Sequence, residues 1–228
     1  ILARSPGLPA VLGLIDATAK LQTGDPVILD GTNGTLIPRP TAAVLAQFAD
    51  RARREEAAQA ELAALAGAEA VMLDRERVTL RANVDLPDEA ARAVESGAEG
   101  VGLMRTEFLV VGRATMPDEE EQYAAYTRVV KAFGGEAVII RTFDVGGDKL
   151  PVGGYPHEAN PFLGWRAIRM CLDESELFKV QLRALMRAAV HGDLRIMLPL
   201  VVTVDEVRET RQLMSECVEE LAERRAPF

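Results

Sequence analysis

The sequence predicts an α/β fold in which a parallel sheet begins near residue 70. Strand-like apolar segments alternate with helical patterns four times in a row, and helix start and stop signals separate them. The segment at residues 137–140 is a near-continuous apolar run, as expected of a strand buried on both faces. Doubly wound sheets and (β/α)8 barrels both begin this way. A whole barrel takes about 250 residues, so four units correspond to about half of one.

The predicted strands and helices follow one another closely. Strands are expected at residues 78–84, 100–104, 137–140 and 196–202. Helices are expected at residues 88–96, 118–134, 160–192 with a restart near Asp173, and 203–225. Asp118 with Glu121, and Thr203 with Glu206, have the spacing of capping boxes. Asn160-Pro161 has the pattern of a helix start, with a capping residue before a proline.

The first part of the chain has a different character. Residues 26–37 read as a β-hairpin with Asn33-Gly34 in its turn. A long Ala-rich helix then runs from Thr41, whose hydroxyl can cap it, to Gly67, which suits a left-handed stop. We therefore expect three regions, with boundaries at residues 1–40, 41–67 and 68–228.

Composition limits the classes of function. Hydrophobic residues make up 48% of the 228 residues and charged residues 27%, which is typical of a globular protein with a core. A membrane span is not expected, because no apolar run reaches about 18 residues. The net charge of −9, without a basic stripe, disfavours nucleic acid as a partner.

Two further features bear on location and on completeness. Cys171 and Cys217 are far apart and lack metal-site spacing, which favours the reducing cytoplasm. We interpret both as residues that pack within helices. The chain starts at Ile1 with neither an initiator methionine nor a signal peptide, so we expect it to be part of a longer protein.

Basic residues follow two neighbouring strands at the point where each ends. Arg105 follows the segment 100–104, and Arg141 follows the segment 137–140. Parallel strands put both arginines at one edge of the sheet, where α/β folds bind ligands. A guanidinium matches carboxylate or phosphate oxygens two at a time. Gly146-Gly147 lets backbone N–H groups approach an anion, and Lys149 adds a mobile charge. These features favour a small-anion site.

A purely structural interpretation stays open beside this one. Each arginine can pair with a nearby carboxylate, Glu107 or Asp144, without binding a ligand. Asp144 and Asp148 lack a third carboxylate in register, so hydrogen bonding within the loop is favoured over metal binding. Trp165 is interpreted as a packing residue in the helix that starts at residue 160. Spacing alone does not identify the anion.

Three segments resemble Enzyme I of the bacterial phosphoenolpyruvate-dependent sugar phosphotransferase system. They are residues 100–109 (Gly-Val-Gly-Leu-Met-Arg-Thr-Glu-Phe-Leu), 141–149 (Arg-Thr-Phe-Asp-Val-Gly-Gly-Asp-Lys) and 160–169 (Asn-Pro-Phe-Leu-Gly-Trp-Arg-Ala-Ile-Arg). Residues 1–10 look like the stretch shortly after the phosphohistidine motif of that family. The likeness covers essentially the whole chain, and the three motifs together are highly specific.

The resemblance carries implications for fold and chemistry. It implies that residues 68–228 are the first half of a (β/α)8 TIM barrel, that residues 41–67 are a linker helix, and that residues 1–40 are the tail of a phosphohistidine domain. The family transfers the phosphoryl group of phosphoenolpyruvate to its own histidine and then to a histidine phosphocarrier protein, with Mg²⁺, as a homodimer. Arg105 and Arg141 match its phosphoenolpyruvate-binding arginines, and Lys149 matches a lysine near the same ligand.

Several parts of that machinery have no match here. The only histidines, His157 and His191, lie outside the phosphohistidine motif, and surface or capping roles are expected for both. The family's metal-binding Glu, its Asn-Asp pair and its acid Cys come after the fourth βα unit. We therefore assign no catalytic residue and no metal ligand. We expect this piece to bind phosphoenolpyruvate weakly and not to turn over.

Two alternatives are kept. A pyruvate phosphate dikinase or phosphoenolpyruvate synthase has a related barrel, but the Gly-Gly-Asp-Lys run favours Enzyme I. The chain can also be a non-catalytic assembly module, because a half barrel leaves open strand edges and exposed apolar residues. On that basis we expect self-association or marginal stability.

Overall fold

The computed structural model describes residues 8–146, 160 and 163–228. The chain falls into two compact units, Ile1–Ala66 and Gly67–Phe228. The first unit contains α1 (Ala17–Lys20), β1 (Val27–Asp30), β2 (Thr35–Pro38) and α2 (Ala42–Ala63). The second contains β3 (Ala82–Val84), α3 (Glu89–Glu95), β4 (Val101–Met104), the 3₁₀ helix η1 (Glu107–Leu109), α4 (Glu119–Ala132), β5 (Val138–Arg141), α5 (Ile168–Asp173), α6 (Ser175–Ala189), β6 (Leu194–Met197) and α7 (Val204–Glu223).

The first unit confirms the predicted hairpin and the predicted start of the long helix. Strands β1 and β2 pair in antiparallel fashion, and the Asp30 carboxylate accepts the backbone N–H of Asn33 at 3.0 Å within the turn. Gly34 has φ +66°, a conformation that glycine adopts without steric cost. At the start of α2, the Thr41 hydroxyl accepts the N–H of Val44 at 3.4 Å.

The predicted end of that helix is wrong. α2 ends at Ala63 with Ala64 still in right-handed helical conformation, and its N–H donates to the carbonyl of Ala60. Gly67 does not adopt a positive φ. The helix ends in ordinary turns before Gly67 is reached, so its last carbonyls are not capped by a left-handed residue.

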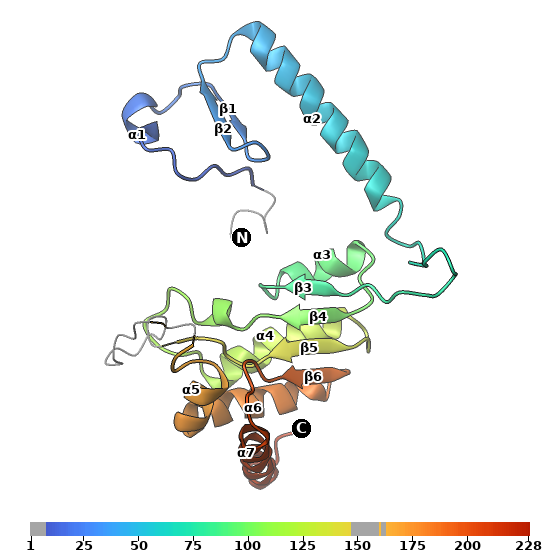
Figure 1. The fold of residues 1–228 in the computed structure, drawn as a ribbon, viewed down its shortest axis with the longest axis vertical. Helices are drawn as coiled ribbons and strands as arrows, with labels where there is room; N and C mark the ends of the chain where they lie inside the picture. The colour runs from blue at the N-terminus through green and yellow to red at the C-terminus, as the bar shows by residue number, and fades with distance from the viewer. Residues whose placement is uncertain (1–7, 147–159, 161–162) are drawn as a thin grey trace. The chain divides into compact units, whose positions relative to one another are not determined.

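The second unit is built on a four-stranded parallel sheet of order β3-β4-β5-β6, as the βα alternation predicts. Helices α3, α4 and α6 lie along one side of this sheet (Figure 1). The side chains of alternate strand residues, such as Met104 and Ile140, are fully buried against those helices. Residues between them, such as Leu103 and Ile139, belong to the other face and are less buried.

Both predicted capping boxes are confirmed. The Asp118 carboxylate accepts the N–H of Glu121 at 2.8 Å, and the Glu121 carboxylate accepts the N–H of Asp118 at 3.1 Å. Thr203 and Glu206 exchange the same two bonds at the start of α7. These reciprocal bonds satisfy N–H groups that a helix start leaves unpaired.

The helix predicted from residue 160 is wrong in its first part. Residues 163–167 are not helical, and α5 begins only after Ala167, which has φ +54°. Trp165 therefore does not lie in a helix, but it is partly buried against the hydrophobic cluster that contains Phe143 and Ile168, as its interpretation as a packing residue predicts. Its indole N–H donates to the Asp173 carboxylate at 2.6 Å.

The first and fourth strands are shorter than predicted. β3 has three residues, and β6 ends at Met197, before Pro199. Proline has no N–H to donate to a strand ladder, and Leu200 then takes φ +58°, so the extended conformation does not continue.

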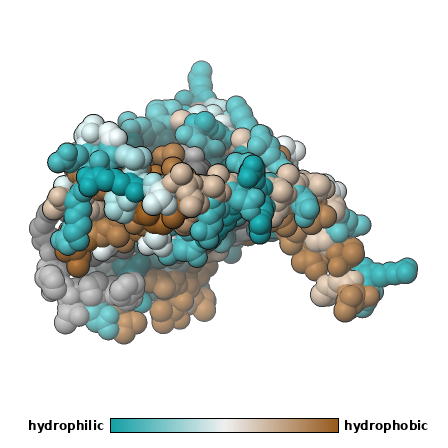
Figure 2. Space-filling model, turned by 90° about the horizontal axis from the view of Figure 1, so that it is seen from above, coloured by the Kyte–Doolittle hydropathy of each residue, from teal (hydrophilic) through white to brown (hydrophobic). Residues whose placement is uncertain are grey.

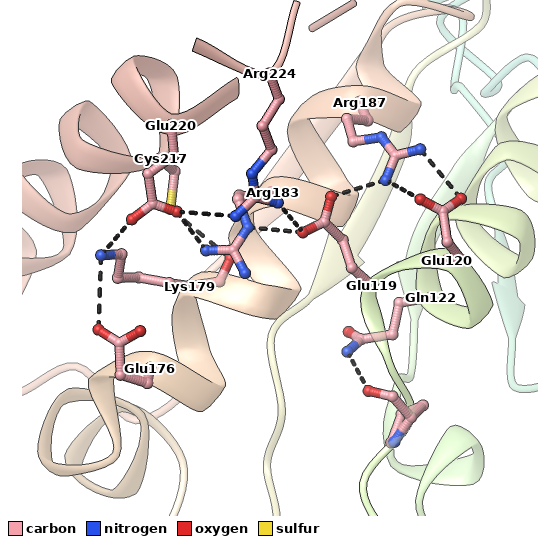
Figure 3. A network of polar contacts seen from close by, with 11 residues as sticks. Glu119, Glu120, Gln122, Glu176, Lys179, Arg183, Arg187, Cys217, Glu220 and Arg224 are labelled. Carbon is pink, nitrogen blue, oxygen red and sulfur yellow. Dashed lines mark hydrogen bonds and ion pairs between the residues drawn. The ribbon is translucent and has the colours of Figure 1, made fainter. Parts of the chain in front are cut away.

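Ion pairs join the helices that surround α6 (Figure 3). Glu119 of α4 accepts from Arg183 and Arg187 of α6, each at 2.7 Å, and Arg183 also donates to Glu220 of α7 at 2.7 Å. Arg183 keeps only 9% of its side chain exposed, so this network lies partly beneath the surface. Within the described part of the chain, no helix is both long and apolar enough to cross a membrane.

Candidate substrate-binding site

Arg105 and Arg141 lie at the same edge of the parallel sheet. Met104 of β4 pairs with Ile140 of β5, and each arginine is the residue that follows its member of that pair. Because both strands run in the same direction, this edge is the one formed by their carboxyl ends. This is the arrangement that the strand-end pattern predicts.

Arg105 links the ends of β3 and β4. Its backbone N–H donates to the carbonyl of Val84 at 3.0 Å, which extends the pairing beyond both strands. Its Nη1 donates to the Asp85 carboxylate at 2.8 Å. The side chain stays 36% exposed, so the guanidinium is held by one carboxylate while part of it faces solvent. Sequence reasoning did not identify Asp85 as its partner.

Arg141 is more enclosed and has two carboxylate partners. It donates through Nη2 to Glu107, which is two residues after Arg105, and its Nη1 lies 3.4 Å from Asp144. The side chain is 20% exposed. Among the described residues, its buried Nε and the buried Oε2 of Glu107 have no hydrogen-bond partner. Both carboxylates named in the structural interpretation therefore do pair with Arg141.

A third arginine, Arg166, belongs to the same cluster and was missed as a site residue. Its Nη2 lies 2.7 Å from the Asp144 carboxylate, and both side chains are 13% exposed. An antiparallel bridge between Gly146 and Arg166 brings the segment before α5 to the end of β5. Nothing in the local sequence distinguishes Arg166 from Arg169, because that contact spans twenty residues of chain.

The cluster is balanced in charge and rich in directed donors. Three arginines (Arg105, Arg141 and Arg166) face three carboxylates (Asp85, Glu107 and Asp144). The carboxylates fix the guanidinium groups in orientation and lower the cost of removing them from water. Guanidinium groups oriented in this way can bind a small dianion through their remaining N–H donors.

Some expected features fall outside the described residues. Lys149, Asp148, Gly147 and His157 are among these. His191 is half-buried, and its Nε2 lies 3.0 Å from the hydroxyl of Tyr123 on α4.

The cysteines contribute packing rather than reactivity. Cys171 and Cys217 are fully buried, as their interpretation as packing residues predicts. Burial raises the pKa of the Cys171 thiol to about 12, and the negative charge of Asp144 adds to that effect. Burial likewise raises the pKa of Cys217 to about 11. Neither thiol is a nucleophile near neutral pH, because the thiolate is the reactive form.

The residues described here do not form a metal centre. No group of three or more His, Cys, Asp or Glu side chains comes together within residues 8–146, 160 and 163–228 in a way that fits a metal ion. Asp144 accepts from arginine side chains, in agreement with its expected hydrogen-bonding role. We therefore derive no chemical step through a metal from these residues.

Comparison with known proteins agrees with this picture. A family model described as "PEP-utilising enzyme, PEP-binding domain" matches residues 59–228, and one described as "PEP-utilising enzyme, mobile domain" matches residues 1–34. Phosphoenolpyruvate-protein phosphotransferases are similar to the chain over nearly all of its length. Those of Geobacillus stearothermophilus and Bacillus subtilis are 46% and 45% identical over 95% and 97% of it.

The protein of Staphylococcus carnosus is 45% identical over 95% of the chain. The chain spans 38–39% of the length of these relatives. The resemblance to Enzyme I that the three sequence motifs carry is thereby confirmed. The chain belongs to the family of phosphoenolpyruvate-utilising enzymes, and relatives that match nearly all of it are named phosphoenolpyruvate-protein phosphotransferase.

Proposed function

We propose that this chain supplies part of the phosphoenolpyruvate-binding surface of a phosphoenolpyruvate-protein phosphotransferase. In this proposal Arg105 and Arg141 bind the phosphate and carboxylate of the substrate, and Lys149 contributes a third positive charge. Family membership supports the substrate class. The arrangement of the two arginines supports their assignment.

The observation that carries the proposal is the pair of arginines at adjacent strand ends. Arg105 and Arg141 follow paired residues of β4 and β5, so their side chains start from equivalent positions. Each is oriented by a carboxylate, and among the described residues the Nε–H donor of Arg141 has no protein acceptor. A buried donor without an acceptor is costly, and a bound anion that reached this nitrogen would remove that cost.

The reaction gives these arginines a clear task. When the phosphoryl group leaves phosphoenolpyruvate, negative charge develops on the enolate and on the transferring group. Fixed guanidinium groups stabilise such charge without having to reorient during the step. A Lys in their place would offer a point charge without the planar fork.

The remaining features belong to the longer protein and are proposed with it. They are a complete (β/α)8 barrel, a linker at residues 41–67, a phosphohistidine domain that includes residues 1–40, a histidine phosphocarrier protein as partner, a homodimer, and a cytoplasmic role in sugar uptake. Mg²⁺ belongs here too. The described residues offer no site that fits it, so its ligands are assigned to no residue described here.

The dikinase and synthase alternatives are not favoured, because the relatives that match the chain are named phosphoenolpyruvate-protein phosphotransferase. An assembly module is kept as a second candidate. The outer edges of β3 and β6 favour it, because no other strand of the described residues pairs with them and an unpaired strand edge invites pairing with another chain.

The test is a titration of the ¹⁵N-labelled chain with phosphoenolpyruvate, with Mg²⁺ added in a second series. We expect backbone amide shifts near Arg105 and Arg141 at millimolar ligand. Arg105→Gln should raise the dissociation constant about tenfold or more, because it removes a charged bond to the ligand. Arg195→Gln is the matched control. Arg195 is also a strand arginine with a carboxylate partner, Asp193, but it is not at this edge.

The control should bind as the unmodified chain does, since it makes the same change in net charge. An absence of amide shifts at millimolar phosphoenolpyruvate contradicts the proposal. An equal loss of affinity in both variants contradicts it as well, because it would mean that overall charge, rather than this site, governs binding.

A further inference from the structure

A buried glutamine connects the two strand ends that carry the arginines. Gln181 of α6 is fully buried. Its Oε1 accepts the backbone N–H of Phe143 at 3.0 Å, and its Nε2 donates to the hydroxyls of Tyr126 at 3.0 Å and Thr106 at 3.4 Å. One side chain therefore contacts the segment after β4, the segment after β5, and helix α4.

The orientation of the Gln181 amide is determined by its partners. The Phe143 N–H can only donate, so the amide oxygen must face it and the amide nitrogen must face the two hydroxyls. The Thr106 hydroxyl donates its own proton to the Arg141 carbonyl at 2.9 Å, which leaves its oxygen free to accept. The direction of each hydrogen bond of the Gln181 amide is therefore determined.

The hydrogen-bond network continues from Gln181 through Tyr126 and Gln122 to a backbone carbonyl. The Tyr126 hydroxyl donates to the Oε1 of Gln122 at 3.0 Å, and the Nε2 of Gln122 donates to the carbonyl of Pro117 at 2.9 Å. Tyr126 and Gln122 are almost fully buried. A buried network that is satisfied throughout is rigid, because changing any one bond leaves a buried polar group unpaired.

These hydrogen bonds lie beside the backbone of both arginines. Thr106 directly follows Arg105, and its hydroxyl holds the carbonyl of Arg141 itself. Phe143 is two residues beyond Arg141. Gln181 therefore hydrogen-bonds to residues that lie one or two positions along the chain from each arginine, while the arginine side chains remain at the sheet edge.

We propose that Gln181 is a positioning residue for phosphoenolpyruvate binding, which sets the relative placement of Arg105 and Arg141 through Thr106 and the Phe143 amide. This inference rests on the proposed function and adds to it a residue that does not contact the ligand. A shift of about 1 Å at groups that bind a reacting substrate can reduce rates a hundredfold. A buried polar side chain that holds such groups in place can therefore have a large effect on function.

The test compares Gln181→Met with Gln122→Met in the ¹⁵N-labelled full chain. Both changes replace a buried glutamine of the same network with an apolar side chain of similar length. The hydrogen bonds of Gln122 go to Pro117 and Tyr126, whereas those to Thr106 and Phe143 come from Gln181. Both should lower the midpoint of thermal unfolding. We expect Gln181→Met to raise the phosphoenolpyruvate dissociation constant about tenfold or more and Gln122→Met to change it less than about twofold, each measured well below its own midpoint.

A milder pair keeps the test decisive if Gln181→Met does not fold. Thr106→Val removes the hydroxyl that joins Gln181 to Arg141 with little change in shape, and Thr106→Ser retains it. Affinity should fall in the first and be preserved in the second. Equal affinities within either pair overturn the inference.

The ligand-free spectra separate this inference from the proposed function. The side-chain Nε–H signals of Arg105 and Arg141 should move in Gln181→Met and stay in place in Gln122→Met. If the unmodified chain fails to respond to phosphoenolpyruvate, the proposed function falls, and these arginine signals alone decide whether Gln181 positions the arginines. If they are unchanged in Gln181→Met, positioning by Gln181 is wrong.

Discussion

Arg141 pairs with two carboxylates, Glu107 and Asp144, and its side chain is mostly buried. A planar guanidinium can contact both carboxylates at once from different nitrogen atoms. An ammonium group has a single nitrogen and is more strongly hydrated, so it meets this geometry less well. The identity of this residue as arginine, beyond its charge, should therefore matter for stability as well as for binding.

Arg141→Lys should lower the free energy of unfolding by about 1–3 kcal/mol, because one carboxylate is left poorly paired in a buried setting. Arg195→Lys is the control, since the Arg195–Asp193 pair is about half exposed and surface pairs contribute about 0–1 kcal/mol. Urea unfolding of both variants at pH 7 measures the difference. Equal losses would show that the double pairing of Arg141 adds nothing to stability.

For individual residues, the sequence predicts a position only where that position follows from the local pattern of the chain. Arg105 and Arg141 could be found because each directly follows an apolar strand segment. Asp85, Arg166 and Gln181 could not, because their contacts depend on how distant segments pack. Gln181 lies within an ordinary helical pattern, and only the folded structure brings it to the amide of Phe143.

Among the elements, helix α6 has the most extensive ionic contacts. Its arginines 183 and 187 share Glu119 of α4, and Arg183 also reaches Glu220 of α7. Burial acts to raise the pKa of Glu119, but hydrogen bonds from Arg183 and Arg187 outweigh that effect and hold the pKa below the ordinary Glu value. The hydrogen bond from Lys179 is the main cause of the lowered pKa of Glu220.

Glu119→Gln should cost about 2–4 kcal/mol of unfolding free energy at pH 7, because two mostly buried guanidinium groups lose a charged partner. Asp205→Asn is the matched control on α7. It breaks a pair with Arg208 in which both side chains are about three-quarters exposed, and we expect less than about 0.5 kcal/mol.

The same variant has a predictable pH dependence. Because the folded-state pKa of Glu119 is depressed, the native state binds fewer protons than the unfolded state in the acid range. The contribution of Glu119 to stability is therefore fully present above its unfolded-state pKa of about 4.3. It is lost as pH falls through the lower folded-state pKa. The difference in unfolding free energy between the unmodified chain and Glu119→Gln should be constant near neutral pH and should decrease below about pH 5. A difference that is unchanged at pH 3 would contradict this linkage.

Local signals predict helix starts where no long-range contact opposes them. The boxes at Asp118 and Thr203 depend on four consecutive residues, and both form. The start at Asn160-Pro161 has an equally local signal, yet residues 163–167 are not helical because Gly146 pairs with Arg166 there and Arg166 contacts Asp144. A long-range backbone bridge and an ion pair thus override a local preference.

For the second unit as a whole, the alternation of strands and helices predicts a parallel sheet, but it does not predict whether that sheet closes into a barrel. Alternating strands and helices lead to parallel order, and the sheet is parallel. Whether such a sheet stays open or closes into a barrel depends on strands beyond the four seen here. Among the residues that the structure describes, no further strand pairs with the outer edge of β3 or of β6. Figure 2, which shows one face of the whole chain, also has several separate patches of hydrophobic residues among hydrophilic ones.

The edge at β6 is bordered by an apolar groove of about 380 Å³ between α6 and α7. Residues of all three elements line it, together with one residue that follows β6: Leu185, Met186, Ala189, Leu194, Ile196, Leu198, Thr210, Arg211 and Met214. A second copy is a suitable partner for this edge. If two copies are related by a twofold axis, β6 of one can pair in parallel with β3 of the other, which closes eight strands and removes every edge.

We therefore expect the chain to self-associate, with a sedimentation coefficient that rises with concentration in the micromolar range. Ala189→Arg introduces a bulky charge into the groove and should shift the equilibrium toward monomer by tenfold or more, roughly the effect of one unpaired charge at an interface. Ala222→Arg makes the same substitution at an exposed position of α7 and should leave association unchanged. A compact monomer at high concentration would contradict this expectation. Equal effects of both variants would instead place the contact elsewhere on the molecule, because Ala222 does not line the groove.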